Sequence, residues 1–160
     1  MSAEFTPELS ARLGAIAGVL GVALHDGGVW VEAPGLDVHA MNEAMAALGI
    51  RLGTITARPL SVQGETVIIY HYIALTTSIN FKTLTRGGAL PSLADRVPAA
   101  SWAEREIKDL FGVDFPGHPN LVPLMKPKGF EDGMLRAAMC GPVLLPRSPT
   151  SKRPGGQEAP

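Results

Sequence analysis

Several side chains able to do acid–base chemistry lie close together in one short segment. Glu104, Glu106 and Asp109 are carboxylates within six residues, and His118 follows nine residues later. A pair of carboxylates can act as general acid and general base. On a helix, however, Glu104 and Glu106 would lie about 200° apart, at roughly 100° per residue. They would therefore not share a substrate, and salt bridging is the favoured interpretation of these carboxylates.

Histidine and cysteine give no pattern typical of a metal or nucleophile site. His25, His39, His71 and His118 are scattered, and none has a second His or Cys at ligand spacing. The single cysteine, Cys140, excludes a disulfide framework within the chain and an iron–sulfur cluster held by this chain alone. We expect His71 to be a satisfied residue of a strand. We expect His118 to lock its local turn or to make a hydrogen bond at an interface.

Composition excludes several other classes of function. There is no phosphate loop, dinucleotide-binding glycine fingerprint or nucleophile elbow. The 160 residues carry a formal charge of −1, which gives no electrostatic reason to expect a nucleic-acid partner. A hydrophobic content of 46% indicates a packed domain.

The N-terminal residues do not resemble a secretory signal, and the apolar run 13–24 is shorter than the ~20 residues of a membrane span. A cytoplasmic protein is expected.

The carboxylates are expected on an amphipathic helix at residues 102–111. Ser101 to Glu104 fits a capping box, in which the serine hydroxyl and the glutamate each accept a free N–H of the first turn. Gly112 supplies the left-handed residue that ends the helix. The predicted buried stripe consists of Ala103, Ile107, Leu110 and Phe111.

The charged residues of this helix predict two ion pairs and one carboxylate without an ion-pair partner in the helix. Glu104–Lys108 and Arg105–Asp109 have the i,i+4 spacing of helical salt bridges. Glu106 has no basic residue at that spacing within the helix. We therefore expect Glu106 to find its partner elsewhere, and most readily on a neighbouring chain.

The remaining chain predicts an α+β fold: a mainly antiparallel sheet with helices packed on one face, then an irregular, proline-rich C-terminal extension. We expect residues 1–125 to form the α+β domain and residues 126–160 an extended, partly disordered arm. Glycines 18 and 21 are expected to end the first helix, and turns are expected at 26–28, 63–64 and 77–78. Helices are predicted at 7–17 and 38–48, and strands at 22–24, 29–31, 52–60, 66–75 and 79–85.

The segment from Trp102 to Leu121 closely resembles the motif of one family, the 30 kDa subunit of the NADH dehydrogenase of respiratory complex I. The shared pattern is Glu-Arg-Glu at 104–106, an acid at 109, two apolar residues, and Gly-His-Pro at 117–119. Residues 90–93 and 97–100 resemble the family's lead-in to this helix, and residues 129–136 its later segment. The similarity extends over roughly residues 29–136.

This resemblance implies a cofactor-free structural subunit, not catalytic on its own, in the hydrophilic arm of a membrane-bound oxidoreductase. Its expected partners are a large catalytic subunit, which it braces for electron transfer, and an adjacent iron–sulfur subunit. Those partners would carry the iron–sulfur clusters and, in a hydrogenase, the nickel-iron centre. The chain would lie peripherally on the cytoplasmic side of the membrane and reach it only through the complex. The implied partner-binding residues are Glu104, Arg105, Glu106, Asp109, Gly117, His118 and Pro119.

One departure from the family pattern bears on which type of complex the chain belongs to. Complex I members usually carry basic residues soon after the Gly-His-Pro, whereas this chain has the uncharged stretch Val122 to Met125. That stretch is more similar to the small subunits of carbon-monoxide-induced or energy-converting [NiFe]-hydrogenases, and it favours the hydrogenase type over the NADH–quinone type. The alternative is a stand-alone α+β binding domain or small enzyme that shares the fold.

Overall fold

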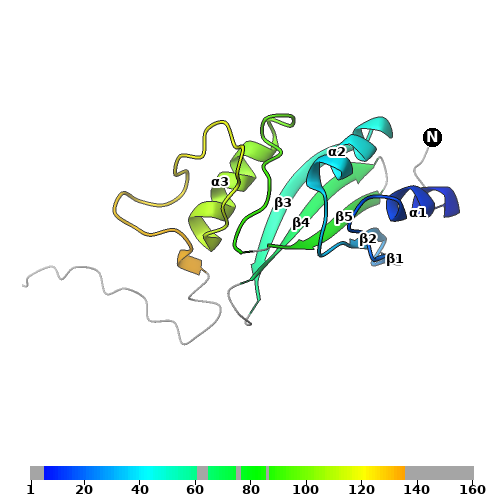
Figure 1. The fold of residues 1–160 in the computed structure, drawn as a ribbon, viewed down its shortest axis with the longest axis horizontal. Helices are drawn as coiled ribbons and strands as arrows, with labels where there is room; N and C mark the ends of the chain where they lie inside the picture. The colour runs from blue at the N-terminus through cyan, green and yellow to red at the C-terminus, as the bar shows by residue number, and fades with distance from the viewer. Residues whose placement is uncertain (1–5, 61–64, 75–76, 86, 136–160) are drawn as a thin grey trace, which may run out of the picture.

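The computed structural model describes residues 6–60, 65–74, 77–85 and 87–135, and its centre is a five-stranded sheet of order β1-β2-β5-β4-β3 (Figure 1). None of the helices in these residues is long and apolar enough to cross a membrane. The elements, in chain order, are α1 (Pro7–Gly14), β1 (Gly21–His25), β2 (Gly28–Glu32), α2 (Val38–Ala47), β3 (Arg51–Pro59), β4 (Thr66–Ala74), β5 (Thr77–Leu84) and α3 (Ala100–Phe111).

The sheet is antiparallel except where β2 meets β5. A tight turn joins β1 to β2, with Asp26 and Gly27 at φ values of 50° and 75°, as a two-residue hairpin requires. From β2 the chain crosses through α2 to β3, and β3, β4 and β5 then pair as an antiparallel meander. β5 therefore returns to the middle of the sheet and pairs with β2 in parallel. The predicted, mainly antiparallel α+β fold is confirmed.

One face of the sheet carries the core. Alternate residues of β4, namely Ile68, Tyr70 and Tyr72, are buried on this face, and Tyr72 packs edge-to-face on Phe81 with ring centroids 5.9 Å apart. All three helices contribute to the same hydrophobic cluster, through Leu9 and Leu13 of α1, Met41 and Met45 of α2, and Ile107 of α3. The helices thus pack on one face, as the sequence predicts.

The first helix is shorter than its apolar spacing suggests. It ends at Gly14, whereas the sequence predicts continuation to about Ala17 and a stop at glycines 18 and 21. Ala17 is instead drawn into a tertiary contact, because its C=O accepts the N–H of Asp37. Gly18 then passes so close to Gly35 that a Cβ at position 18 would lie 2.2 Å from the Gly35 oxygen. The close approach of two backbone segments therefore ends the helix before the predicted position.

One predicted turn is also wrong. Thr77 and Ser78 lie within β5, where they pair with Ala74 and Ile73 of β4. These pairs extend the hairpin, so that the connection falls at residues 75–76, which lie outside the described residues. The predicted turn at 63–64, the end of the predicted strand at Leu75, Cys140 and the arm beyond residue 135 also lie outside them.

Candidate partner-binding surface

Helix α3 begins without the predicted capping box. Ala99 is the N-cap residue and no side chain caps the helix, so the prediction of a Ser101–Glu104 box is wrong. The Glu104 side chain turns inward and is fully buried. Its Oε1 accepts the N–H of Leu93 at 2.7 Å and its Oε2 accepts the hydroxyl of Ser92 at 2.5 Å. Because the loop before α3 supplies these donors, Glu104 fastens that loop to the helix instead of capping it.

Burial of Glu104 has an electrostatic consequence. Desolvation raises the pKa of this carboxyl, although the bonds from Ser92 and Leu93 act in the opposite direction. Among the described residues the buried hydroxyl of Tyr70 has no hydrogen-bond partner, and burial together with the Glu104 charge raises the Tyr70 pKa. The buried Glu104 carboxyl is thus held by the donors of Ser92 and Leu93, a placement typical of a structural constraint.

His118 closes the other side of the same cluster. Its Nδ1 accepts the N–H of Asn120 at 2.9 Å, so Nε2 must carry the ring hydrogen of the neutral imidazole. Nε2 lies 3.2 Å from the Ser101 hydroxyl, 3.3 Å from the Ser101 carbonyl oxygen and 4.0 Å from Glu104 Oε2. Both side chains of the His118–Glu104 pair are shielded from solvent. His118 therefore locks its own turn onto α3, which is one of its two predicted roles.

Asp109 and Arg105 hold the segment that follows the turn. Asp109 Oδ2 accepts the backbone N–H groups of Leu124, Met125 and Lys126 at 2.7, 2.6 and 3.2 Å. Partial desolvation raises the pKa of Asp109, but these three bonds outweigh it and hold that pKa below its ordinary value. Arg105 donates to the carbonyl oxygens of residues 122 and 123, at 2.8 and 3.2 Å.

The two ion pairs predicted within α3 are therefore wrong. Glu104 is buried away from Lys108, which pairs with Asp114 at a distance of 2.8 Å. Arg105 and Asp109 both bind main-chain groups of residues 122–126. Helical spacing alone favours the i,i+4 pairs, but each is worth only about 0.2–0.5 kcal/mol. Bonds to otherwise unpaired main-chain groups contribute more, and so the side chains turn toward the neighbouring segments.

The remaining predicted site residues face outward. Glu106 is exposed, and no ion-pair partner for it exists among the described residues. Gly117, at φ 88°, and Pro119 are exposed in the turn around His118. Of the seven predicted partner-binding residues, four thus make polar contacts that hold neighbouring segments on α3, and the other three are exposed.

Sequence reasoning missed a set of exposed apolar side chains on and after α3. Trp102, one helical turn from Glu106, is 71% exposed, and Met125 is 59% exposed. We name the set the α3 apolar surface; it consists of Trp102, Val122, Met125, Phe130, Met134 and Leu135. Val122, Met125 and Phe130 lie in an irregular stretch, and Met134 and Leu135 are the only two helical residues described after α3, so no amphipathic pattern signals these five residues. Their only signal is the apolar composition of a proline-rich segment.

This surface lies at one end of the molecule. In Figure 1, α3 and the yellow-to-orange segment after it lie at the end of the sheet away from α1 and β1. The segment stays against α3, because Gly133 donates its N–H to the carbonyl oxygen of Asp109 and passes within van der Waals distance of Gly112. No group of three or more His, Cys, Asp or Glu side chains able to hold a metal ion occurs in the described part of the chain.

Comparison with known proteins identifies the relationship. Curated relatives that match include C and C/D subunits of NADH-quinone oxidoreductases, and this chain spans 8% to 36% of the length of these relatives. The C/D subunit of Buchnera aphidicola subsp. Baizongia pistaciae (strain Bp) is 36% identical over 73 residues, which are 43% of this chain and 12% of that protein.

Two solved structures share the fold. One is a chain of the membrane-bound sulfane sulfur reductase, an archaeal respiratory membrane complex, with a TM-score of 0.61, 24% identity and 69% of each chain covered. The other is the trypsin-resistant fragment (1–134) of Nqo5, with a TM-score of 0.58, 22% identity, and 71% of this chain and 97% of the fragment covered. At these identities the likeness shows the fold alone. The family model of the 30 kDa subunit of respiratory-chain NADH dehydrogenase matches residues 37–140, and the chain belongs to this family.

Proposed function

We propose that this chain is a structural subunit of the hydrophilic arm of a membrane-bound oxidoreductase related to complex I. One observation carries the proposal: large apolar side chains are exposed on a segment that the chain itself holds in place. Monomeric proteins rarely expose large apolar patches without a binding role. An interface typically uses aromatic residues and methionine at its centre, as Trp102 and Met125 would supply here.

The polar contacts of α3, some buried and some exposed, hold the backbone of this surface in place. Asp109 and Arg105 fix the backbone of residues 122–126, and Glu104 and His118 fix the loops on either side of α3. A surface held in its bound conformation loses less entropy on association. These four residues therefore act in partner binding by positioning, whereas Glu106 is exposed and able to contact a partner directly.

The partners we propose are a large catalytic subunit and an adjacent iron–sulfur subunit. In this role the chain binds no cofactor and holds the two subunits in register, so that electron carriers stay within transfer distance. The partners carry the iron–sulfur clusters, and the membrane is reached through the complex, on its cytoplasmic side. The single cysteine of the sequence supports a chain without a cluster of its own.

Two branches of such complexes remain distinct proposals. The stretch Val122 to Met125, which has no basic pair, favours the [NiFe]-hydrogenase type, and its Met125 belongs to the α3 apolar surface. The names of the curated relatives favour the NADH–quinone type. The neighbouring coding sequences discriminate between them: a large subunit with four nickel-ligating cysteines indicates the hydrogenase, and flavin-binding and NADH-binding subunits indicate the other.

The test compares two equally exposed apolar residues at opposite ends of the molecule. Met125 and Leu24 are 59% and 57% exposed, on the α3 apolar surface and on β1. With the tagged full chain expressed in its own organism, Met125→Asp should abolish co-purification of other subunits, whereas Leu24→Asp should retain them. Both purified variants should unfold at the wild-type denaturant concentration. Equal retention of partners by both variants would refute the proposed surface. A wild-type chain that is recovered alone, with an activity of its own, would instead support the stand-alone domain.

A further inference from the structure

The edge of β5 is left open where β2 ends. Toward the C-terminal end of β2, the final hydrogen bond to β5 is the one that the Ala33 N–H donates to the Lys82 carbonyl oxygen. The next residue, Pro34, has no N–H to donate, and the Ala33 carbonyl oxygen accepts from Leu36 in a turn. The chain therefore leaves the sheet at this point, while β5 continues to Leu84.

The register shows which way the main chain of Leu84 faces. Thr85 donates its N–H to the Thr66 carbonyl oxygen, so Thr85 and Thr66 form a hydrogen-bonded pair of the antiparallel ladder. Bonded and non-bonded pairs alternate, so that Leu84 and Val67 form a non-bonded pair. The N–H and C=O of Leu84 therefore point away from β4, toward the position that β2 has vacated. Neither group has a main-chain partner among the described residues.

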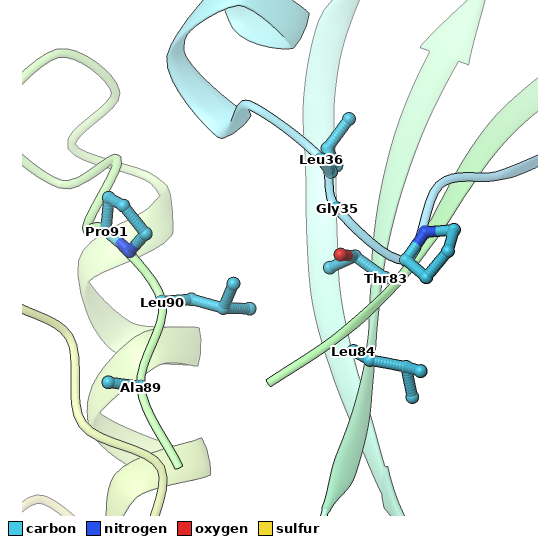
Figure 2. A pocket seen from close by; sticks show the side chains of 8 residues that line it. Gly35, Leu36, Thr83, Leu84, Ala89, Leu90 and Pro91 are labelled. Atoms are coloured by element: carbon cyan, nitrogen blue, oxygen red, sulfur yellow. The ribbon is translucent and has the colours of Figure 1, made fainter. Parts of the chain in front are cut away.

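Clefts adjoin this open edge on both faces of the sheet. One, of about 210 Å³, lies between Thr83 and Leu36 on one side and Leu90 and Pro91 on the other (Figure 2). Thr83 lines this cleft, and its buried hydroxyl has no hydrogen-bond partner in the part of the chain that the structure describes. The second cleft, of about 350 Å³, shares Pro34, Thr83 and Leu84 with the first and continues past Val67 and Leu60.

These features match an added β-strand better than a small ligand. The open N–H and C=O of Leu84 are the pair that one residue of a neighbouring strand would bond. Successive side chains of a strand point to opposite faces, and here there is one cleft on each face. The second cleft also carries Arg58, which is exposed and has no ion-pair partner in the described part of the chain, and Lys82, which pairs with Glu32. Its excess of positive charge fits an acidic side chain.

We propose that an extended segment of a partner polypeptide adds to the sheet along the open edge of β5 at Leu84. The segment places an apolar side chain in the cleft beside Thr83 and an acidic side chain near Arg58. This site lies outside the α3 apolar surface and provides a second point of attachment. The inference rests on the proposed function, because it takes the partner from the same complex.

The direct test measures amide hydrogen exchange of Leu84 in the full chain alone and in the complex purified through a tag on the chain. A strand added at this edge should slow exchange of Leu84 by about 100-fold or more, with no change at the exposed turn residue Gly27. A chain that co-purifies with the complex but exchanges at Leu84 as the free chain does would overturn this inference and leave the proposed function intact. Failure of the wild-type chain to co-purify would refute the proposed function itself.

The occupant can be identified with a photo-crosslinking amino acid in place of Ala89, which lines the first cleft. The proposal expects a crosslink to one short stretch of another subunit. Leu84→Pro, which removes the N–H, should lower the crosslink yield about tenfold relative to the matched control Leu84→Ala. A crosslink to a second copy of this chain, or to its own residues 136–160, would overturn the proposal. If Leu84→Pro does not fold, Thr83→Phe tests the same cleft by filling it and should abolish the slow exchange of Leu84.

Discussion

The two ends of the molecule differ in where their carboxylates lie. Around the sheet, carboxylates pair with basic side chains at the surface, as in Glu8–Arg12 and Glu32–Lys82, and most apolar side chains form the core, although Leu20 and Leu24 are exposed. At α3, two carboxylates, Glu104 and Asp109, are buried, whereas tryptophan and methionine side chains are exposed. The sheet end is thus held together mainly by apolar burial. The α3 end has the features of one side of an interface. There, hydrogen bonds to buried carboxylates supply part of the stability that apolar burial supplies in the core.

Removal of Asp109 should have the largest effect on this arrangement. Asp109→Ala leaves three main-chain N–H groups of residues 124–126 without their acceptor, at about 1 kcal/mol each. Urea unfolding of the full chain should show a loss of about 2–4 kcal/mol, and trypsin should cleave faster after Lys128, which follows the released segment. Asp114→Ala is the matched control, since Asp114 is exposed and its ion pair with Lys108 lies at the surface; this substitution should cost less than about 1 kcal/mol. Equal losses of unfolding free energy in the two variants would contradict the claim that the buried carboxylate stabilises the fold more than the surface carboxylate does.

The second effect is a pH dependence that originates at Glu104. Its folded-state pKa is raised by burial, so its contribution to stability is complete below the ordinary glutamate pKa and is lost as pH rises through the folded value. Glu104→Gln removes this titration while it keeps an oxygen to accept a bond. The free energy of unfolding of the variant, minus that of the wild type, should therefore increase from pH 4 to pH 8 in urea titrations. If the free energies of unfolding of the two proteins changed with pH in parallel, ionisation of Glu104 would not destabilise the folded protein.

A smaller effect on stability, but a clear one on assembly, is expected at Glu106 and Arg105. Glu106→Ala alone should leave the melting temperature unchanged, because the carboxylate is exposed and unpaired within the described residues. Combined with Arg105→Ala, which frees the carbonyl oxygens of residues 122 and 123, it should abolish co-purification of the large subunit. Circular dichroism of the double variant should still show a folded domain. Normal co-purification of the double variant would contradict the account.

The smallest effect is expected at a surface ion pair of the sheet. Lys82 and Glu32 are both partly exposed and lie 2.9 Å apart. Glu32→Gln should cost less than about 1 kcal/mol, and the cost should disappear in concentrated salt. A larger cost that persists in salt would mean that charge at the sheet end also has a structural role.

The sequence predicts the sheet end well because local patterns determine it. The helix predicted at 38–48 and the strands predicted at 52–60 and 66–75 each lie within one residue of α2, β3 and β4. His71 is satisfied as predicted, with Thr56 and Asn80 as its partners. The early end of α1 was not predictable in this way, because it depends on the approach of Gly18 to Gly35, which are distant in sequence.

At the α3 end, the sequence predicts which residues matter but not what they contact. The Glu-Arg-Glu and Gly-His-Pro motifs mark the correct region, and the helix has nearly its predicted bounds. Apart from the bond from the Ser92 hydroxyl to Glu104, the hydrogen bonds of Glu104, Arg105 and Asp109 are with main-chain groups of segments 11 to 18 residues away. Main-chain groups carry no sequence signal, so spacing rules favoured side-chain pairs that do not form. The assignment of these residues to partner binding remains a prediction.

Hydroxyl-radical footprinting of the assembled complex tests the central claim most directly. Trp102 and Met125 are reactive, and both are exposed in the isolated chain. If α3 and the segment after it bind a larger protein of the complex, oxidation of both side chains should fall several-fold on assembly, while oxidation of the exposed Leu24 on β1 should stay as in the free chain. Equal oxidation of Trp102 and Met125 in the free and assembled chains would contradict the account.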